Sequence, residues 1–278
     1  MSLQDLEFRH RYKFNKYDYY QQRLNGEHMK FTTLLTIAVM GLSLSANSLA
    51  TETSVMVRAK AVDAKYIGTS VGSVKVVVED AETGEILDQG WITGDTGSTD
   101  TLIKNPITRG QALTDKTTAG FLAKVDISSP RLLRFKLIGP YAYRQSLQEA
   151  TVTSWVIPGK DILGDGITLN MPGFIVDAWT RVLASGQVDI FTKASMLCGC
   201  PIFPDGHWDP SGYEAMAILM QNEVKVAEVK LDFTGPVGLF SGKTTITEPG
   251  HYKAIVYLFD KKTGNVGVDR TMFEINAK

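Results

Sequence analysis

Short apolar segments separated by glycine turns run through residues 51–278 and limit what this chain can fold into. In several of them apolar and polar residues alternate, and the run 74–79 is rich in β-branched residues, which is typical of strands. Turn sequences recur between the segments, at Thr83-Gly84, Asp95-Thr96-Gly97 and Gly164-Asp165-Gly166. Many short strands at this spacing favour an all-β fold built from sandwiches.

The strands expected from this pattern are distributed along the chain after residue 53. One segment, 214–220, is ambiguous, because its alanine, methionine and leucine content also suits a helix. Its short length, between a Gly/Pro loop and Asn222, favours a strand. We expect strands at residues 54–62, 74–79, 121–127, 132–138, 151–157, 167–170, 174–176, 188–194, 214–220, 224–233, 243–247, 251–260 and 270–275.

Residues 29–50 have the three parts of a secretory signal peptide. Met29 and Lys30 precede an apolar run of about 14 residues, and small residues at Ser48 and Ala50 follow it. The alternative is a membrane anchor, which needs about 18–20 continuous apolar residues, and threonine, glycine and serine interrupt this shorter run. We therefore expect cleavage after Ala50 and a periplasmic or secreted bacterial protein.

Residues 1–28 precede the expected signal peptide. They are polar and aromatic and show no sustained helix or strand period. We interpret them as the product of a start codon assigned too early, with an authentic cytoplasmic extension or an expression leader as the alternatives. Residues 1–50 are therefore left out of the expected fold.

Two consecutive domains are expected after the signal peptide. Residues 76–84 and 256–264 both run from an apolar strand into Asp-x-x-Thr-Gly. The aspartate starts such a turn through its side chain, and the glycine takes the left-handed conformation before the return strand, so both segments predict hairpins. With a break at Ser185-Gly186, we expect domain 1 at residues 51–184 and domain 2 at residues 188–278.

Both halves resemble known β-sandwich families in their turns and strands. Residues 72–97, with a valine-rich strand, an Asp-x-x-Thr-Gly-Glu turn and an Asp-Thr-Gly turn, look like a transthyretin-like or carboxypeptidase-regulatory-type sandwich. Residues 248–257, where Pro-Gly-His-Tyr precedes an alternating apolar strand, are similar to bacterial immunoglobulin-like modules. The resemblance implies two consecutive sandwiches of these types and an accessory, binding or structural role. It supplies no catalytic residue.

Charge and motif content argue against several classes of function. The chain carries 29 Lys and Arg against 30 Asp and Glu, and this near-neutral balance disfavours nucleic-acid binding, which needs a basic stripe. It contains no Gly-x-Ser-x-Gly, no His-Glu-x-x-His and no phosphate-binding glycine loop. We expect a non-catalytic protein without a cofactor or a stable membrane anchor, which contacts an unidentified protein or small ligand in the cell envelope.

Residues 195–212 are the chemical outlier of the chain. They include both of its cysteines, three prolines and three glycines, a content that prevents regular structure and gives a long, stiffened loop. Loops of this kind on a β scaffold often carry function. We expect the loop 198–212 to contact the partner or ligand. Its candidate contact residues are Pro201, Phe203, His207, Trp208 and Asp209.

Three interpretations of Cys198 and Cys200 stay open. Export to an oxidising compartment favours a disulfide between them, as a structural clip or a redox-active pair. Their soft thiolates favour instead a copper site, completed by Met196 and His207. Free thiols or pairing with another chain are the third interpretation. A copper-binding or thiol-redox accessory protein is accordingly the alternative to a binding module.

The expected locations of the tryptophan and methionine side chains follow from their neighbours in the sequence. Trp155 and Trp179 have apolar, strand-like surroundings and are expected in the core. Met216 and Met220 share an apolar segment with alanine and isoleucine and are expected there too. Trp208 lies in the stiff loop and is expected to be a contact residue, because tryptophan is enriched at interfaces.

Overall fold

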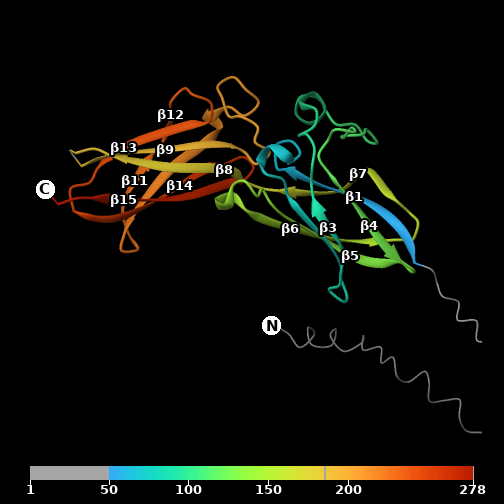
Figure 1. Ribbon diagram of the computed structural model, residues 1–278. Coiled ribbons are helices and arrows are strands. Elements are labelled where there is room, and N and C mark those ends of the chain that lie inside the picture. The colour runs from blue at the N-terminus through green and yellow to red at the C-terminus, as the bar shows by residue number, and fades with distance from the viewer. Residues whose placement is uncertain (1–49, 185, 278) are drawn as a thin grey trace, which may run out of the picture. The chain divides into compact units, whose positions relative to one another are not determined.

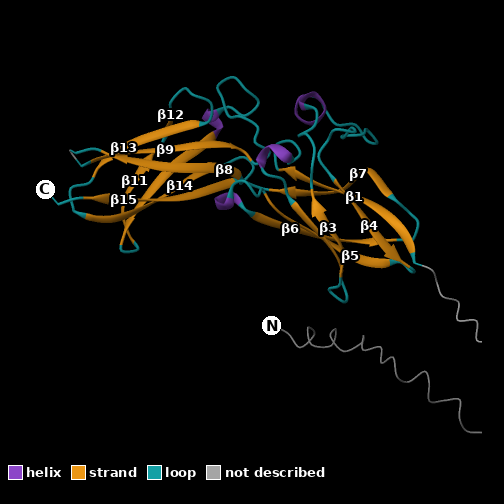
Figure 2. Ribbon diagram, viewed as in Figure 1, coloured by secondary structure: helices purple, strands orange, loops and turns teal. Residues whose placement is uncertain are grey.

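A computed structural model describes residues 50–184 and 186–277. The expected leader at residues 1–28 lies outside this part, as does the expected signal peptide apart from Ala50. Strands form almost all of the regular structure, and the described residues contain only four short helical turns (Figure 2). None of these helical turns could span a lipid bilayer. The all-β prediction is confirmed, with four sheets consistent with two β-sandwiches.

The N-terminal half contains two sheets, with strand orders β4-β1-β7 and β3-β2-β5-β6 (Figure 1). Their strands are β1 (Thr51–Ala61), β2 (Lys75–Asp80), β3 (Ile86–Trp91), β4 (Phe121–Ile127), β5 (Arg131–Gly139), β6 (Gln148–Val156) and β7 (Ile162–Met171). The helical turns of this half are η1 (Thr69–Val71), η2 (Asp100–Lys104) and η3 (Arg144–Ser146). β3 was not among the predicted strands.

The C-terminal half contains the other two sheets, with strand orders β12-β13-β9-β8 and β11-β10-β14-β15. Their strands are β8 (Phe174–Val182), β9 (Gln187–Met196), β10 (Tyr213–Gln221), β11 (Val224–Lys230), β12 (Asp232–Phe233), β13 (Leu239–Thr245), β14 (Gly250–Asp260) and β15 (Val266–Ile275). The helical turn η4 (Pro210–Gly212) precedes β10. The ambiguous segment 214–220 is therefore a strand.

The change from N-terminal to C-terminal sheets occurs earlier than the expected domain boundary. β8 pairs antiparallel with β9 along its whole length, and Leu183 N donates to Gln187 O in the turn that joins them. The expected division into 51–184 and 188–278 thus falls inside a hairpin of the C-terminal half. Strand pairing places the change of sheets at Pro172-Gly173, between β7 and β8. Separate folding of the two halves stays a prediction.

Alternation along the strands builds the core. Val55, Val57 and Ala59 of β1 are fully buried, as are Leu133 and Phe135 of β5. Burial of each such valine, leucine or phenylalanine stabilises the fold by about 1.5–3 kcal/mol relative to exposure. Two tryptophan predictions are wrong, because Trp155 is 61% exposed and Trp179 is 41% exposed. Both occupy strand positions on the faces that point away from the core.

The two Asp-x-x-Thr-Gly segments form equivalent hairpin turns, as predicted. Asp80 Oδ1 accepts hydrogen bonds from the backbone N–H groups of Glu82 and Thr83, both at 2.9 Å. Asp260 Oδ1 accepts one from Lys262 N at 2.8 Å. Gly84 and Gly264 have φ of 77° and 76°, the left-handed conformation that such a turn requires.

The second of these turns also links the two halves. Asn265, which follows Gly264, is fully buried. Its side chain donates to Val62 O at 3.1 Å and accepts from Gly173 N at 3.0 Å. The equivalent residue of the first turn, Glu85, is exposed. One buried amide therefore ties the start of β15 to the N-terminal half.

Candidate interaction surface

β10 and β14 are apolar on both of their faces. On the inner side, Ala217 and Leu219 of β10 and Val256 and Leu258 of β14 are fully buried. The residues between them on β10 are also apolar, but they are only half-buried, because alternation turns them to the other face. Met216 and Met220, expected in the core, belong to this outer set.

Strand pairing brings the outward apolar residues of three strands together. Met216 pairs with Tyr257, which pairs with Val268, and Phe259 pairs with Val266. We call the resulting surface the outer apolar face. Its residues are Met216, Ile218, Met220, Ile255, Tyr257, Phe259, Val266, Val268 and Met272. None of these side chains is fully buried, and Met272 is 65% exposed.

Charged residues surround the outer apolar face, and most are already paired. Lys253 Nζ lies 2.6 Å from Glu223 Oε1, and Lys261 Nζ lies 2.9 Å from Glu214 Oε2. The hydrogen bond from Lys261 lowers the pKa of Glu214, and burial raises the pKa of Tyr257, whose hydroxyl donates to Glu214. These groups form a charged rim around an apolar centre, which is the usual composition of a protein interface.

The expected contact loop lies largely against the N-terminal half of its own chain. Cys198 and Cys200 are joined by a disulfide, and both are buried. Gly199 between them has φ of 79°, and a Cβ there would lie 2.8 Å from Val71 Cγ1. Only glycine therefore lets the Cys-Gly-Cys turn pack this closely on η1.

Trp208 is a structural residue and not an exposed contact. Only 5% of its surface is accessible, and its indole N–H donates to Asp63 O at 2.8 Å. Tryptophan combines a large apolar ring with one donor, so a cleft with a carbonyl group at its end satisfies it. The contact predicted for this side chain is thus made within the chain.

The other predicted loop residues divide into two groups. Asp209 caps η4, since its Oδ1 accepts hydrogen bonds from Ser211 N at 2.9 Å and from Ser211 Oγ at 2.6 Å. The Ser211 hydroxyl lowers the pKa of Asp209. Pro201, Phe203 and His207 are exposed and remain available to a partner.

The residues proposed for a copper site do not form an open cluster. Met196 is buried, and its Sδ lies 3.7 Å from the Tyr213 hydroxyl. The disulfide occupies both sulfurs of Cys198 and Cys200. Within residues 50–184 and 186–277, no group of three or more His, Cys, Asp and Glu side chains could hold a metal ion. Copper binding would need reduced thiols and stays a hypothesis.

Two cavities adjoin the loop. One, of about 560 Å³, is lined by Asp209 of the loop and by Glu214, Lys230, Asp232 and Lys261. Lys230 pairs with Asp232, and Lys261 pairs with Glu214, so these charges are mutually satisfied. The other, of about 260 Å³, lies between the halves and is lined by Val71, Tyr143, Asp177, Lys193, Gly199 and Pro201, among others.

Comparisons with known proteins give likenesses of fold. No protein-family model matches the chain, and no curated protein matches it. A solved structure of a DUF3823 family protein from Bacteroides ovatus is similar at 10% identity, with 80% of this chain and 100% of that chain covered and a TM-score of 0.31. The chicken interferon gamma receptor alpha chain is similar at 8% identity, with 82% and 98% covered and a TM-score of 0.31.

Proposed function

We propose that this protein is an exported, non-catalytic interaction module of the cell envelope, and that it docks through the outer apolar face. One observation carries the proposal: β10 and β14 are apolar on both sides, and the inner side alone faces the core. Strands with two apolar faces are typical of sheets that are covered on both sides. A second layer would cover the outer apolar face as the β8–β9 sheet covers the inner one.

Burial of this face would be favourable. Removal of apolar surface from water contributes about 25 cal/mol per Å², and exposed apolar patches of several hundred Å² mark interaction sites. Met216, Met220 and Met272 also give the face an adaptable surface, because methionine is flexible and polarizable. The paired charges at the rim keep the face soluble when it is free.

Export is the second part of the proposal. It is supported by the tripartite segment at residues 29–50. β1 begins at Thr51, the residue that the expected cleavage would leave at the N-terminus. In the envelope, Pro201, Phe203 and His207 of the loop would offer a smaller, secondary contact, whereas Trp208 and Asp209 maintain the structure of the chain.

Hydroxyl-radical footprinting tests whether the outer apolar face is covered in the cell. The protein in intact envelopes is compared with the same protein purified and highly diluted. We expect oxidation of Met272 and Tyr257 to fall several-fold in the envelope sample. Trp155, exposed on the N-terminal half, is the matched control and should react equally in both samples. Equal oxidation of Met272 in the two samples would overturn the proposal.

A further inference from the structure

We infer that the partner on the outer apolar face is a second copy of this chain, packed face to face about a twofold axis that runs parallel to the strands between β10 and β14. The inference rests on the proposed function of this face and names its partner. A twofold arrangement uses the same surface on both copies, so each contact must be complementary to itself. The order of residues across the sheet meets this condition.

The central row of the sheet is self-complementary in charge and in shape. Glu228 of β11 pairs with Ile218 of β10, which pairs with Ile255 of β14, which pairs with Arg270 of β15. The row therefore reads acid, isoleucine, isoleucine, base. The proposed axis exchanges its two ends, so Arg270 of each copy faces Glu228 of the other. Ile218 of each copy then packs on Ile255 of the other.

The central residues of the two neighbouring rows are compatible with the same axis, which would place the outer lysines of these rows, Lys230 and Lys225, along apolar side chains of β15. In one, Met216 pairs with Tyr257, so the axis places a methionine of each copy on a tyrosine ring of the other. In the next, Met220 pairs with Lys253, and the lysine stem would lie along the methionine of the second copy. Lys253 keeps its own partner, Glu223, at 2.6 Å, so its charge stays balanced.

Arg270 supplies an unused charge for this contact. Its guanidinium has no ion-pair partner among the residues that the structure describes, and it lies beside the apolar residues of β14 and β15. Glu228 pairs with Lys225 at 2.9 Å, but both side chains are about half exposed, and such pairs contribute little to stability. Glu228 could therefore exchange Lys225 for Arg270 of the second copy with little loss of stability. Twofold symmetry would form two Arg270–Glu228 pairs in each dimer.

The size of the face is sufficient for a specific but modest dimer. Four strands about 4.8 Å apart, each about nine residues long at about 3.3 Å per residue, give a footprint of about 500–600 Å² on each copy. The total of about 1,000–1,200 Å² reaches the lower limit for a specific interface. Two packed sheets also match the spacing of about 10 Å at which sheets normally stack. We expect a dimer that dissociates on dilution.

A charge-exchange experiment tests this inference. Sedimentation velocity over a wide concentration range measures the dimer of the protein purified from cells that export it. We expect Arg270→Glu and Glu228→Arg, each alone, to weaken the dimer about tenfold or more, because each puts two like-charged pairs in the interface. The double variant Arg270→Glu/Glu228→Arg restores opposite charges and should return the dimer to within about threefold of the original.

Two further measurements make the outcome decisive. Lys124→Glu, a reversal of an exposed charge on β4, is the matched control and should leave the dimer unchanged. Circular dichroism melts show that each variant is folded. A monomer at all concentrations, or a dimer insensitive to both single reversals, would overturn the inference. If the purified protein is monomeric while Met272 is protected in the envelope, the proposed function stands and the second copy is the wrong partner.

Discussion

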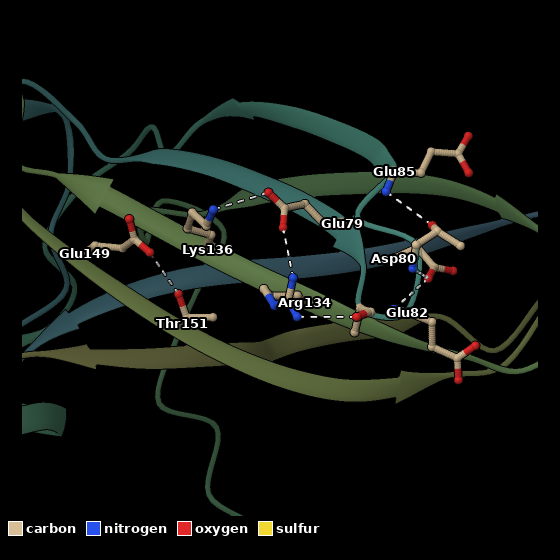
Figure 3. A network of polar contacts seen from close by, with 10 residues as sticks. Glu79, Asp80, Glu82, Glu85, Arg134, Lys136, Glu149 and Thr151 are labelled. Atoms are coloured by element: carbon tan, nitrogen blue, oxygen red, sulfur yellow. Dashed lines mark hydrogen bonds and ion pairs between the residues drawn. The ribbon is translucent and has the colours of Figure 1, made fainter.

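The outward faces of two sheets, one in each half, differ in the chemistry of their central rows. In the sheet of β2, β5 and β6, the outward row Glu79–Arg134–Thr153 is polar, and Glu79 lies between Arg134 and Lys136 at 3.4 and 3.3 Å (Figure 3). In the sheet of β10, β14 and β15, the corresponding face is largely apolar, with Lys253 and Arg270 beside its apolar residues. Both sheets have buried inner faces, so the two sheets differ in the chemistry of their outer faces.

This contrast is the basis for the proposed docking surface. In the centre of β5 the polar residues Arg134 and Lys136 alternate with buried apolar residues, and their ion pairs with Glu79 are satisfied within the outward face. β10 and β14 lack that alternation, and nothing in the inner core requires their outward apolar residues. Those residues therefore indicate a further contact.

The largest expected effect comes from a direct comparison of the two sides of β10. Leu219→Ala should lower the free energy of unfolding by about 2–5 kcal/mol, because Leu219 is fully buried and its truncation leaves a cavity. Ile218→Ala, its half-buried neighbour on the outer face, should cost about 1 kcal/mol or less in dilute protein. Urea denaturation measures both. Equal losses would show that the outer face is a second core and not a docking surface.

The next effect extends the comparison to the two equivalent hairpin turns. Asn265→Ala should lower the free energy of unfolding by about 1–3 kcal/mol, because it removes the partner of the buried Gly173 N and of the partly buried Val62 O. Glu85→Ala, at the matching position of the first turn, should change it by less than about 0.5 kcal/mol. Thermal melts compare the two. A harmless Asn265→Ala would mean that the halves are held together by other contacts.

A smaller effect is expected at the disulfide. Replacement of Cys198 and Cys200 by serine should cost at most about 1–2 kcal/mol, because a disulfide that closes so short a loop removes little entropy from the unfolded chain. Hydrogen exchange should rise locally around Gly199, while the outer apolar face keeps its properties. Mass spectrometry with and without reductant, together with copper analysis of exported protein, is the control. Two free thiols with bound copper would contradict the structural disulfide and support the copper-site alternative.

The smallest expected effect concerns the pH dependence of stability that arises from Asp80 in the hairpin turn of the N-terminal half. Hydrogen bonds from the backbone N–H groups of Thr83 and Glu82 lower the pKa of Asp80 in the folded protein. Its contribution to stability is therefore present above the ordinary aspartate pKa of about 3.9 and is lost as the pH falls through the lower folded value. Asp80→Asn should reduce the loss of stability between neutral and acidic pH. An unchanged pH profile would assign the acid sensitivity to other carboxylates.

Local patterns predicted most strands and both hairpins. The strand at 121–127 and the turns at Asp80 and Asp260 depend on neighbouring residues, and the structure has them as expected. β3 escaped prediction because Gly90 interrupts its pattern. A Cβ on Gly90 would lie 2.2 Å from the ring of Phe121, so the missing side chain reflects a neighbour that is distant in sequence.

The candidate site could be predicted only in part, because it too depends on residues that are distant in sequence. A signal was available, since 215–220 is a continuous apolar run, and such a run in a strand indicates two covered faces. The loop attracted attention because cysteine, proline and tryptophan are rare and conspicuous. Whether Trp208 meets solvent or the backbone of Asp63 depends on how two halves pack, and no local pattern contains that information.

Local chemistry alone dictated the class of fold, the turns and the alternating cores of single strands, because side-chain alternation and turn geometry act over a few residues. Tertiary structure decided which strands are neighbours and therefore which side chains share a face. It assigned β8 to the C-terminal sheets, placed Trp208 inside, and aligned Glu228, Ile218, Ile255 and Arg270 in one row. These outcomes depend on contacts between residues far apart in the chain, whose energies only the complete packing determines.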